Sequence, residues 1–485
     1  MIHATWTRVG KRAILPRMTV PANIFREYDI RGVAERDLSD ELAEGIGRAF
    51  GATLSGDAKD GKPLRLAVGR DCRLSSPRLH AALLRGLEKA GVHVVDIGIG
   101  PTPMLYFAVY NLGTDGGIQI TGSHNPGDEN GFKMMRGKAS FFGADIQKLR
   151  ERIVAKDFGE DRTGKGRVEP FDVQDAYVAT MKERFDFGGS ELVFTLDAGN
   201  GSGGPLGMRT MKALGLSPDP LFCEMDGNFP NHHPDPTVEK NLAALVARVK
   251  ETKARVGLAY DGDADRIGAV DEHGTVIWGD KLMILFSRAL LKDKPGSTIL
   301  GEVKCSQTLY DDIAKHGGMP VVWKTGHSLI KTKMKETGAM LAGEMSGHIF
   351  FADRYFGYDD AIYAGLRLLE ILMKDPRPLS EMLADVPKTF STPELRVDCP
   401  DAIKFQVVAA VTRHFKEKGN PVLDIDGARI SFPGTSSAPK WGLVRASNTG
   451  PILVMRFEAG TEAELAEIRG EVEGIVTAER AKLAS

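Results

Sequence analysis

The segment LRLAVGRDCRLSSPRLHAALLRGLEKAGVHVVDI, residues 64–97, is the most informative stretch for the architecture of this chain. Its stretch Leu64-Arg-Leu-Ala-Val68 predicts a strand, and residues 92–97 predict a second one. Between them, Ser76 is placed to cap a helix that has Pro77 as its first residue and stops at Gly91. A helix between two strands is typical of a parallel α/β sheet.

The same alternation of strand and helix continues through most of the chain. Further strands are expected at 191–196, 256–260, 298–303, 319–323 and 340–343, with helices near 205–214 and 238–254. This order predicts parallel, doubly wound sheets. From about residue 386 the pattern changes to two strand pairs, at 421–432 and 441–457. A terminal helix with a Thr461–Glu464 capping box follows them, which predicts a smaller α+β domain.

The length of 485 residues is too great for one hydrophobic core and indicates three to four domains. The best linkers are the stretches 157–167, 376–388 and 391–400, with a further junction near 268–280. We therefore expect an N-terminal lead-in at 1–20, α/β domains at 21–165, 166–270 and 271–385, and an α+β domain at 386–485. The basic lead-in lacks the apolar core of a signal peptide, and we assign it no function.

The composition is that of ordinary globular proteins, with 42% hydrophobic and 26% charged residues. A formal net charge of -2 gives no bulk basic field, which argues against nucleic acid and membranes as partners. No apolar run approaches the roughly 18 residues that a membrane helix requires. The four cysteines lie far apart without metal-type spacing, which indicates reduced thiols and a cytoplasmic location.

A glycine-rich loop, Thr121-Gly-Ser-His-Asn-Pro-Gly-Asp-Glu-Asn-Gly-Phe-Lys133, follows an apolar run that predicts a strand. Glycine and proline at this density favour a fixed turn, so Ser123 is expected on a bend beside His124, with Lys133 at the far end. A hydroxyl beside an imidazole and a cation suits a nucleophile or a phosphate carrier. The same residues would equally suit an ordinary Asx/Ser turn with a solvated lysine.

Three acids alternate in Asp261-Gly-Asp-Ala-Asp-Arg266, directly after the predicted strand 256–260. Such carboxylates repel one another by about 1 kcal/mol per close pair even when well solvated, which favours a divalent cation between them. Oxygen ligands select Mg²⁺ or Ca²⁺ over zinc. A solvated acidic turn is the alternative. An EF-hand is excluded, because Arg266 stands where its invariant glycine belongs and a strand leads in.

Two further loops carry polar side chains in suggestive patterns. Arg445-Ala-Ser-Asn-Thr-Gly450 offers a guanidinium, two hydroxyls and an amide for phosphate oxygens, although an ordinary hairpin turn uses similar residues. Glu344, Ser346 and His348 alternate, and an extended backbone would point all three to one side, toward vicinal sugar hydroxyls. A strand end with satisfied polar groups would look the same.

Several rival signatures are missing from the sequence. Thr121 and Asn125 stand where a nucleophile elbow needs glycine. There is no Walker A loop and no strand-linked Gly-x-Gly-x-x-Gly fingerprint. His232-His233 is read as a turn bounded by prolines and not as a metal pair.

The four loops, taken together and in this order, resemble the α-D-phosphohexomutase family, and most closely its bacterial phosphomannomutase/phosphoglucomutase branch. The similarity runs from roughly residue 20 to the end of the chain. It implies a heart-shaped α/β architecture, in which three doubly wound α/β domains and a C-terminal α+β domain surround a central cleft. In chain order, the domains are implied to contribute a phosphoserine loop, a metal loop, a sugar-binding loop and a phosphate-binding loop.

The resemblance also implies roles for individual residues. Ser123 would be the phosphoserine, and Asp261, Asp263 and Asp265 would bind Mg²⁺ together with a phosphoserine oxygen. Sugar hydroxyls would contact Glu344, Ser346 and His348, and the non-reacting phosphate would contact Arg445, Ser447, Asn448 and Thr449. The remaining expected site residues are Tyr28, Arg31, His124, Lys133, Arg266, Lys304 and His327. Ala264, where glycine is frequent, and Gly450 depart from the family pattern without removing a ligand.

The implied reaction moves a phosphoryl group between the 1- and 6-positions of mannose or glucose phosphates, through a 1,6-bisphosphosugar. Glucose 1,6-bisphosphate would activate the serine, and His124, Lys133 or His348 would accept the proton. Hexose phosphates are the expected partners of a monomer or small homo-oligomer. The alternatives are a phosphoglucosamine mutase, which Met345 disfavours because glutamine is usual there, and a non-catalytic sugar-phosphate-binding protein.

Overall fold

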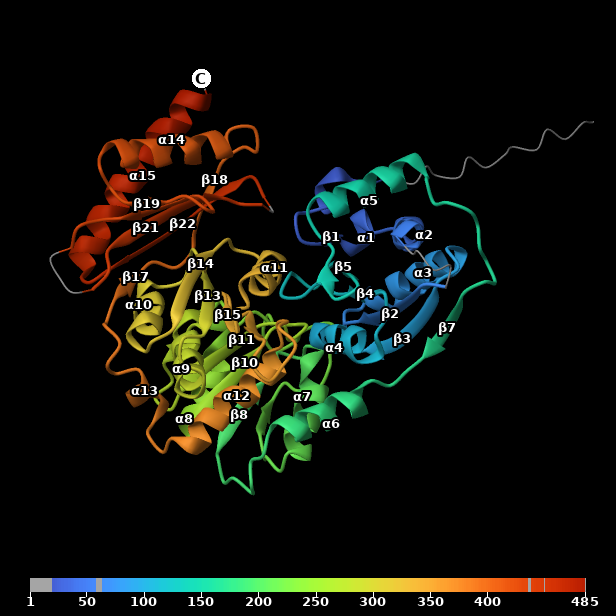
Figure 1. Cartoon of the computed structure of the whole chain (residues 1–485), viewed down its shortest axis with the longest axis horizontal. Helices are drawn as coiled ribbons and strands as arrows, with labels where there is room; N and C mark the ends of the chain where they lie inside the picture. Colours follow the sequence, from blue (N-terminus) through green and yellow to red (C-terminus); the bar gives the residue numbers. More distant parts are fainter. Residues whose placement is uncertain (1–19, 58–62, 435–437, 449, 485) are drawn as a thin grey trace, which may run out of the picture.

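Four β-sheets, each with its own helices, follow one another along the chain (Figure 1). The computed structural model describes residues 20–57, 63–434, 438–448 and 450–484. We call each sheet with its helices a unit and number the units in chain order. The expected lead-in therefore lies, up to residue 19, outside the described residues.

The first unit is a seven-stranded mixed sheet of order β1-β5-β4-β2-β3-β7, with β6 paired to β5. Its strands are β1 (Ile30–Val33), β2 (Arg65–Arg70), β3 (His93–Ile99), β4 (Gly116–Ile120), β5 (Glu129–Arg136), β6 (Ala139–Ser140) and β7 (Arg167–Pro170). Its helices are η1 (Ala22–Ile24), α1 (Ala34–Asp37), α2 (Asp40–Asp57), α3 (Ser76–Lys89), α4 (Thr102–Leu112) and α5 (Ala144–Ala155). Because β7 pairs with β3, we propose that this unit extends to Pro170.

Both faces of the first sheet are buried, as expected for a doubly wound sheet. Leu66 and Val68 of β2 pack in the hydrophobic cluster formed with α2, α3 and α5. Ala67, between them, packs on the other face with α4. Alternate side chains of a strand point to opposite faces, so a continuous apolar strand needs helices on both sides.

The second unit has five strands in the order β12-β11-β10-β8-β9. They are β8 (Phe194–Asp197), β9 (Asp219–Leu221), β10 (Val256–Tyr260), β11 (Ile267–Asp271) and β12 (Val276–Ile277). The helices are α6 (Gln174–Arg184), α7 (Gly203–Ala213), η2 (Glu239–Leu242) and α8 (Ala243–Thr252). The single helix expected at 238–254 is thus a short 3₁₀ turn followed by a shorter α-helix.

The third unit has four strands in the order β14-β13-β15-β16. They are β13 (Thr298–Glu302), β14 (Met319–Trp323), β15 (Leu341–Gly343) and β16 (Ile349–Phe351). The helices are α9 (Gly279–Asp293), α10 (Gln307–Lys315), α11 (His327–Thr337), α12 (Ala361–Lys374) and α13 (Leu379–Met382). One hydrophobic core runs from α4 of the first unit through the second and third units, which joins the three.

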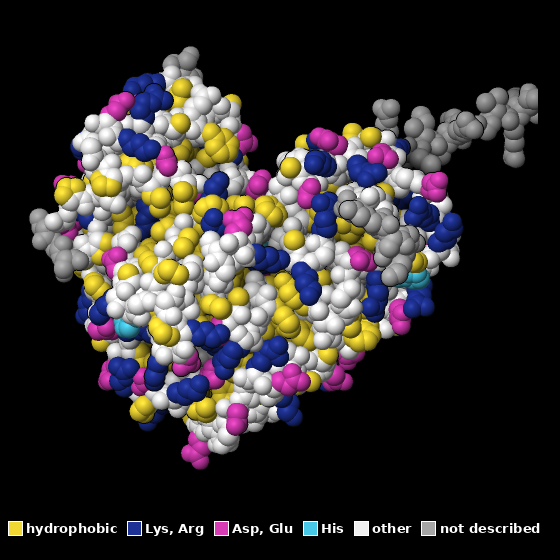
Figure 2. Space-filling view, in the orientation of Figure 1, with side chains coloured by type: hydrophobic (Ala, Val, Ile, Leu, Met, Phe, Trp, Pro, Cys, Tyr) yellow, Lys and Arg dark blue, Asp and Glu magenta, His cyan; other side chains and the backbone are white. Residues whose placement is uncertain are grey.

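The fourth unit is antiparallel throughout, as expected for an α+β domain. Its strands are β17 (Phe390–Ser391), β18 (Leu395–Asp398), β19 (Val422–Leu423), β20 (Ala428–Ser431), β21 (Trp441–Ala446) and β22 (Ile452–Ala459), with α14 (Lys404–Glu417) and α15 (Glu462–Ala484) on the sheet. This unit has a core of its own. The outline of the molecule is heart-shaped, with a notch between the fourth unit and the first (Figure 2).

Two helix caps were predicted from sequence, with different outcomes. The Ser76 cap is wrong: Ser75 precedes α3, and the Ser76 hydroxyl lies inside the helix and donates to Asp71 Oδ1 at 2.5 Å. The Thr461 cap is confirmed in part, because the Thr461 hydroxyl accepts a hydrogen bond from the Glu464 amide at 3.1 Å. The described residues include no helix that is long and apolar enough to cross a membrane.

Candidate active site

Ser123 lies on the bend that follows β4, at the carboxyl end of a central strand of the first sheet. Its Oγ donates to Asp261 Oδ2 at 2.9 Å and lies 3.0 Å from His124 Nδ1. The residue has a φ of 49°, in the left-handed region that non-glycine residues seldom occupy. Such strain persists only where the surroundings fix the backbone, and it often marks a functional residue.

The backbone of this loop is fixed by Arg73, a residue that the sequence analysis did not single out. The Arg73 guanidinium is fully buried and donates to four backbone carbonyls. The acceptors are the oxygens of Ser123 at 2.8 Å, Asn125 at 2.6 Å, Pro126 at 2.5 Å and Glu129 at 2.9 Å. An arginine has five donors in a rigid fork, so one side chain can hold four points of a loop.

The first turn of the loop closes against the same arginine. Asp71 accepts from the Gly122 amide at 3.0 Å, and its carboxylate lies 3.3 Å from Arg73 Nε. A Cβ at Gly122 would lie 2.2 Å from Arg73 Nε, so only glycine fits there. From the second unit, His233 Nε2 lies 2.5 Å from the carbonyl oxygen of His124. The expected fixed bend is therefore confirmed, and it is held from two units.

Asp261, Asp263 and Asp265 follow β10 of the second unit and are completely buried. One ligand atom from each lies within 4.8 Å of the others. Asp261 Oδ1 accepts from the amides of Asp265 and Arg266, each at 3.1 Å, which curls the loop around this carboxylate. The solvated acidic turn considered as an alternative is excluded by this burial.

Lys133 neutralises part of this charge from the first unit. Its Nζ is 2.8 Å from Asp263 Oδ2 and also pairs with Asp265. Burial alone would lower the pKa of Lys133, but Asp263 and Asp265 outweigh it and raise the pKa above its usual range. Burial would raise the pKa of Asp263, and the Lys133 charge outweighs it and lowers that pKa. Lys133 is therefore a buried cation and not a solvated surface lysine.

The residues present fit a divalent cation. The Oδ1 atoms of Asp263 and Asp265 are buried without a hydrogen-bond partner among the described residues. The pKa of Asp261 is raised well above its usual range by burial and by the charges of Asp265 and Asp263. The positive charges nearby do not fully compensate three buried carboxylates. Orphaned carboxylate oxygens beside a serine hydroxyl form the kind of donor set that Mg²⁺ accepts.

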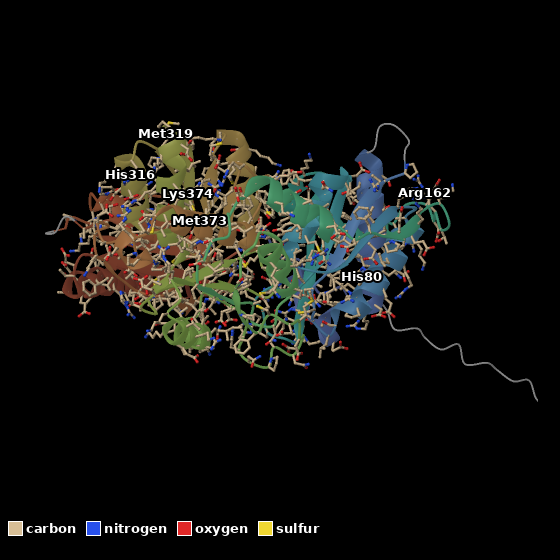
Figure 3. All side chains as sticks on the ribbon, turned by 90° about the horizontal axis from the view of Figure 1, so that it is seen from below. His80, Arg162, His316, Met319, Met373 and Lys374 are labelled. Carbon is tan, nitrogen blue, oxygen red and sulfur yellow. The ribbon has the colours of Figure 1, made fainter. Side chains whose placement is uncertain are left out.

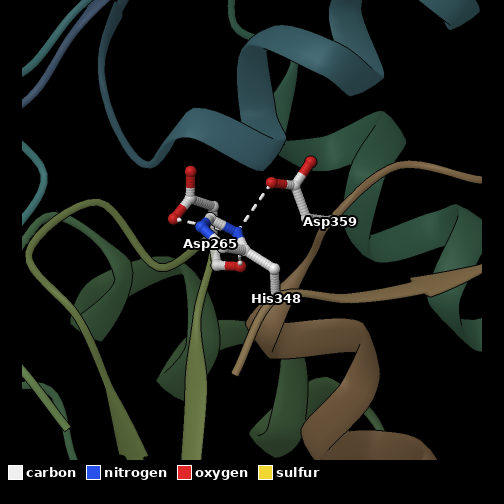
Figure 4. Close-up of side chains that lie close together, drawn as sticks. All are labelled: Asp265, His348 and Asp359. Carbon is white, nitrogen blue, oxygen red and sulfur yellow. Dashed lines mark hydrogen bonds and ion pairs between the residues drawn. The ribbon is translucent and has the colours of Figure 1, made fainter. Parts of the chain in front are cut away.

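Arg266 and His348 join this centre to the third unit, and Figure 4 shows His348 beside Asp265 and Asp359. Arg266 Nε donates to His348 Nε2 at 2.9 Å. The other ring nitrogen, Nδ1, lies 2.9 Å from Asp359 Oδ2 and 3.1 Å from the Asp265 carbonyl oxygen. Because Nε2 accepts, the proton of a neutral His348 belongs on Nδ1, where both oxygens can receive it. The sequence analysis missed Asp359.

The loop that follows β15 is a tight turn, so the expected extended backbone is wrong there. Glu344 accepts from the Gly326 amide at 2.6 Å and from the Ser346 hydroxyl at 3.1 Å. His348 points instead toward Arg266. Gly347, with a φ of 94°, reverses the chain, and this reversal breaks the alternation on which the prediction rested.

Four more expected site residues come from the first and third units and are buried or half-buried, namely Tyr28, Arg31, Lys304 and His327. The Tyr28 hydroxyl donates to the Thr325 carbonyl at 2.9 Å and its ring lies 6.0 Å from that of His327. Lys304 Nζ is 3.2 Å from Glu394 Oε2. Two of the four carry buried nitrogens that lack a partner among the described residues, Arg31 Nη1 and His327 Nδ1.

The fourth unit reaches the site through the loop between β21 and β22. Arg445 Nε donates to Asp426 Oδ2 at 3.1 Å, and the Asn448 amide donates to the Tyr28 hydroxyl at 3.0 Å. Ser447 is buried beside them. Thr449, the last residue expected here, lies outside the described residues. The Asn448–Tyr28 hydrogen bond joins the fourth unit to the first.

Two further histidines, His80 and His316, belong to ion pairs in the first and third units and lie toward opposite sides of the molecule (Figure 3). His80 lies 3.1 Å from Asp96, and His316 lies 3.3 Å from Asp312. The structure thus brings together the described residues that the sequence predicted for one site, and it adds Arg73 and Asp359.

Sequence models of the phosphoglucomutase/phosphomannomutase family match the chain in four consecutive segments. Alpha/beta/alpha domains I, II and III match residues 22–160, 175–274 and 278–390, and the C-terminal domain matches residues 394–475. The chain therefore belongs to the phosphoglucomutase/phosphomannomutase family.

Individual relatives resemble the chain over nearly its whole length. It is 46% identical to the phosphomannomutase/phosphoglucomutase of Pseudomonas aeruginosa, over 93% of this chain and 95% of that protein. It is 43% identical to a phosphoglucomutase of Neisseria gonorrhoeae, over 94% and 97%. The crystal structure of a phosphoglucomutase/phosphomannomutase family protein from Burkholderia thailandensis superposes with a TM-score of 0.87 at 43% identity, covering 95% of this chain and 98% of that one.

Proposed function

We propose that this protein is a hexose-phosphate mutase that moves a phosphoryl group between the 1- and 6-positions of mannose or glucose phosphates. The observation that carries the proposal is the position of Ser123 Oγ, 2.9 Å from Asp261 within a buried acidic triad. A hydroxyl beside a buried carboxylate triad, with the buried Lys133 and the half-buried Arg266 as nearby cations, suits a group that carries phosphate. The names of relatives more than 40% identical support the same reaction.

Phosphorylated Ser123 would transfer its phosphoryl group to a free hydroxyl of a hexose monophosphate. The P–Oγ bond breaks with its electron pair staying on Oγ, a P–O bond to the sugar forms, and the proton of the sugar hydroxyl passes through a basic side chain to Ser123 Oγ. The product of this half-reaction is a 1,6-bisphosphosugar. After the sugar turns end for end, its other phosphoryl group returns to Ser123 and the proton returns to the sugar oxygen.

The acidic triad would hold Mg²⁺, with Asp261, Asp263 and Asp265 as ligands and a phosphoserine oxygen beside them. A bound Mg²⁺ supplies positive charge to the transferring phosphoryl oxygens. Lys133 lies on the same carboxylates and adds a second positive charge from the first unit. Phosphoryl transfer needs chiefly alignment and charge neutralisation, which these residues offer.

His124 is the side chain best suited to accept the proton. Its Nδ1 lies 3.0 Å from Ser123 Oγ. Burial, Arg266 and Arg31 lower the pKa of His124 well below its usual value, so the ring is neutral, and a proton that it takes from the sugar would pass on to Ser123 Oγ. Lys133 is less suited, because its two carboxylate partners keep it protonated. The Nε2 lone pair of His348 accepts a hydrogen bond from Arg266, so His348 is the second candidate for the proton acceptor.

The sugar would lie between the loop of the third unit and that of the fourth. Glu344 and Ser346 offer a carboxylate and a hydroxyl for sugar hydroxyls, and Arg445 and Ser447 offer donors for the phosphate that does not react. Because the fourth unit has its own core and meets the first through the Asn448–Tyr28 contact, it can move to let the bisphosphate turn. We further propose a monomer or small homo-oligomer in the cytoplasm, activated by glucose 1,6-bisphosphate.

A substrate panel on the phosphorylated enzyme tests this function. Mannose 1-phosphate and glucose 1-phosphate should be converted to the 6-phosphates in the presence of Mg²⁺, and glucosamine 1-phosphate should react more slowly. A preference for glucosamine 1-phosphate would assign the protein to aminosugar metabolism instead. Ser123→Ala should bind the sugar phosphates and convert none of them. Binding without conversion by the wild type would favour a sugar-phosphate sensor.

A further inference from the structure

A cavity lies between the first and third units, and no residue of the serine loop or the acidic loop lines it. It has a volume of about 200 Å³ and is lined by α4, the β5–β6 hairpin, α11 and residues 357–358. Figure 1 shows α11 near the centre of the molecule, where the third unit meets the first. No residue assigned above to the proposed reaction lines this cavity.

The charged residues of the cavity are mostly lysines. Lys138 comes from the β5–β6 hairpin, and Lys331 and Lys335 come from successive turns of α11. Lys331 is already paired, 3.0 Å from Asp359. Within the described parts of the chain, Lys138 and Lys335 form no ion pair with a carboxylate: Lys335 Nζ donates to the Lys138 carbonyl at 2.9 Å, and Lys138 Nζ lies 4.9 Å from the centre of the Tyr110 ring.

One carboxylate, that of Glu336, lines the cavity, but it pairs with a lysine outside the cavity. Glu336 pairs with Lys333, 3.1 Å away on the same helix. Burial, Lys331 and Lys138 lower the pKa of Lys335, as expected for an ammonium group that faces other cations. The cavity therefore presents two positive charges that the described protein does not balance.

The remaining wall is aromatic. Tyr106, Tyr110 and Tyr358 line it, and their rings pack against one another at centroid distances of 5.4 Å for Tyr106–Tyr358 and 5.5 Å for Tyr110–Tyr358. The space corresponds to about seven water molecules at their liquid volume of ~30 Å³ each. Pockets for drug-sized molecules are larger, about 300 Å³ or more, so the natural occupant is small.

We propose that this cavity binds a small organic phosphate, whose phosphoryl group lies between Lys138 and Lys335 and whose carbon body lies on the tyrosines. A phosphate monoester carries close to two negative charges at neutral pH, which matches two unpaired ammonium groups. A monocarboxylate would leave one lysine uncompensated. The site is separate from the proposed reaction and does not depend on it.

Pyridoxal 5′-phosphate is a suitable probe, because its aldehyde reports which lysine it meets. The amine of a lysine condenses with the aldehyde to an imine with loss of water, and borohydride then reduces the imine to a stable secondary amine. Peptide mapping of the full-length protein locates the label. We expect Lys335 to be labelled first and in a saturable way. Glycerol 3-phosphate should protect Lys335, and glycerol should not.

Two variants make the test specific. Lys138→Met should weaken the protection of Lys335 by glycerol 3-phosphate at least tenfold, since it removes one of the two charges. Lys374→Met is the control, because Lys374 is an exposed lysine of α12 that pairs with Glu370 at 3.1 Å and does not line the cavity, and it should change nothing. Equal, non-saturable labelling of Lys333 and Lys335, or protection by acetate as good as by glycerol 3-phosphate, would overturn the proposal.

Discussion

Replacing Arg73 by alanine should reduce turnover sharply without preventing folding. The Arg73 side chain contacts no expected substrate group, and its effect should pass through the backbone that carries Ser123. The variant removes four donors from four carbonyl groups of the serine loop, those of Ser123, Asn125, Pro126 and Glu129. The loop is then free to relax from the left-handed conformation at Ser123, where φ is 49°.

The magnitude follows from these contacts. A hydrogen bond to a charged group contributes about 1.5–3 kcal/mol, and a strained non-glycine residue stores about 1–3 kcal/mol that relaxation would release. The four bonds are not additive, because water can replace some of them. A displacement of the Ser123 hydroxyl by about 1 Å costs roughly 100-fold in rate. We therefore expect kcat to fall about 100- to 1,000-fold, equivalent to about 3–4 kcal/mol in the activation barrier.

The assay compares kcat and KM for glucose 1-phosphate in wild type, Arg73→Ala and Arg78→Ala. Arg78 is a matched control, because it also donates to two backbone carbonyls, those of Ala34 and Leu38, but holds α1 and α2 instead of the serine loop. KM should change little in Arg73→Ala, since sugar and phosphate contacts come from other units. Added guanidinium ion should restore part of kcat in Arg73→Ala and have no such effect on Arg78→Ala.

One result would refute this reasoning. If Arg73→Ala folds with an unchanged thermal midpoint and keeps the wild-type kcat, the arginine does not position the serine. A loss of kcat that merely follows the fraction of unfolded protein, with no response to guanidinium, would likewise reduce Arg73 to a structural role.

Three further predictions concern the metal, the contact between units and the proton acceptor. Asp263→Ala should weaken Mg²⁺ binding, measured by calorimetry, by at least about 100-fold, because even indirect partners of metal ligands contribute 10- to 100-fold; unchanged affinity would contradict the metal assignment. Lys304, together with Arg396, lowers the pKa of Glu394 to about 2 against burial, which raises it, so the Lys304–Glu394 pair with Arg396 should contribute about 3 kcal/mol above pH ~4.5 that is lost as the pH falls toward 2. Glu394→Gln should flatten that part of the stability profile in urea unfolding, and an unaltered profile would exclude the pair as its source. His124→Gln should lower kcat about 100-fold or more while KM stays similar, and wild-type kcat would transfer the role to His348.

The layout of the fold could be read from the sequence because its signals are local. Strands without charged residues, such as Val256–Tyr260, predict a sheet that is buried on both faces, and the change to hairpins after residue 386 marks the last domain. Predictions that rested on a single residue were weaker. Ser76 looks like a helix cap, but Asp71 recruits its hydroxyl, and only the folded loop brings these two together.

The site could be predicted in part for the same reason. Ser123 and the three aspartates lie in short motifs whose residue types carry chemistry, so the sequence singles them out. Arg73 and Asp359 do not lie in such motifs, because each contacts another part of the chain. Arg73 donates to carbonyls 50 to 56 residues further along, and Asp359 contacts His348. Their neighbours in sequence give no hint of these partners. The turn at Gly347 could not be predicted, because the alternation of Glu344, Ser346 and His348 is compatible with both an extended strand and a chain reversal.

Transfer of a labelled phosphoryl group through Ser123 tests the central claim most directly. The protein would be incubated with glucose 1,6-bisphosphate carrying ³²P and freed of ligand. One portion would be digested, and peptide mass analysis would locate the label. A second portion would be mixed with unlabelled glucose 1-phosphate in a single turnover. The account predicts label on Ser123 alone, and its passage to the sugar at a rate no slower than kcat. Label on another residue, or label on Ser123 that stays there while the sugar is converted, would contradict it.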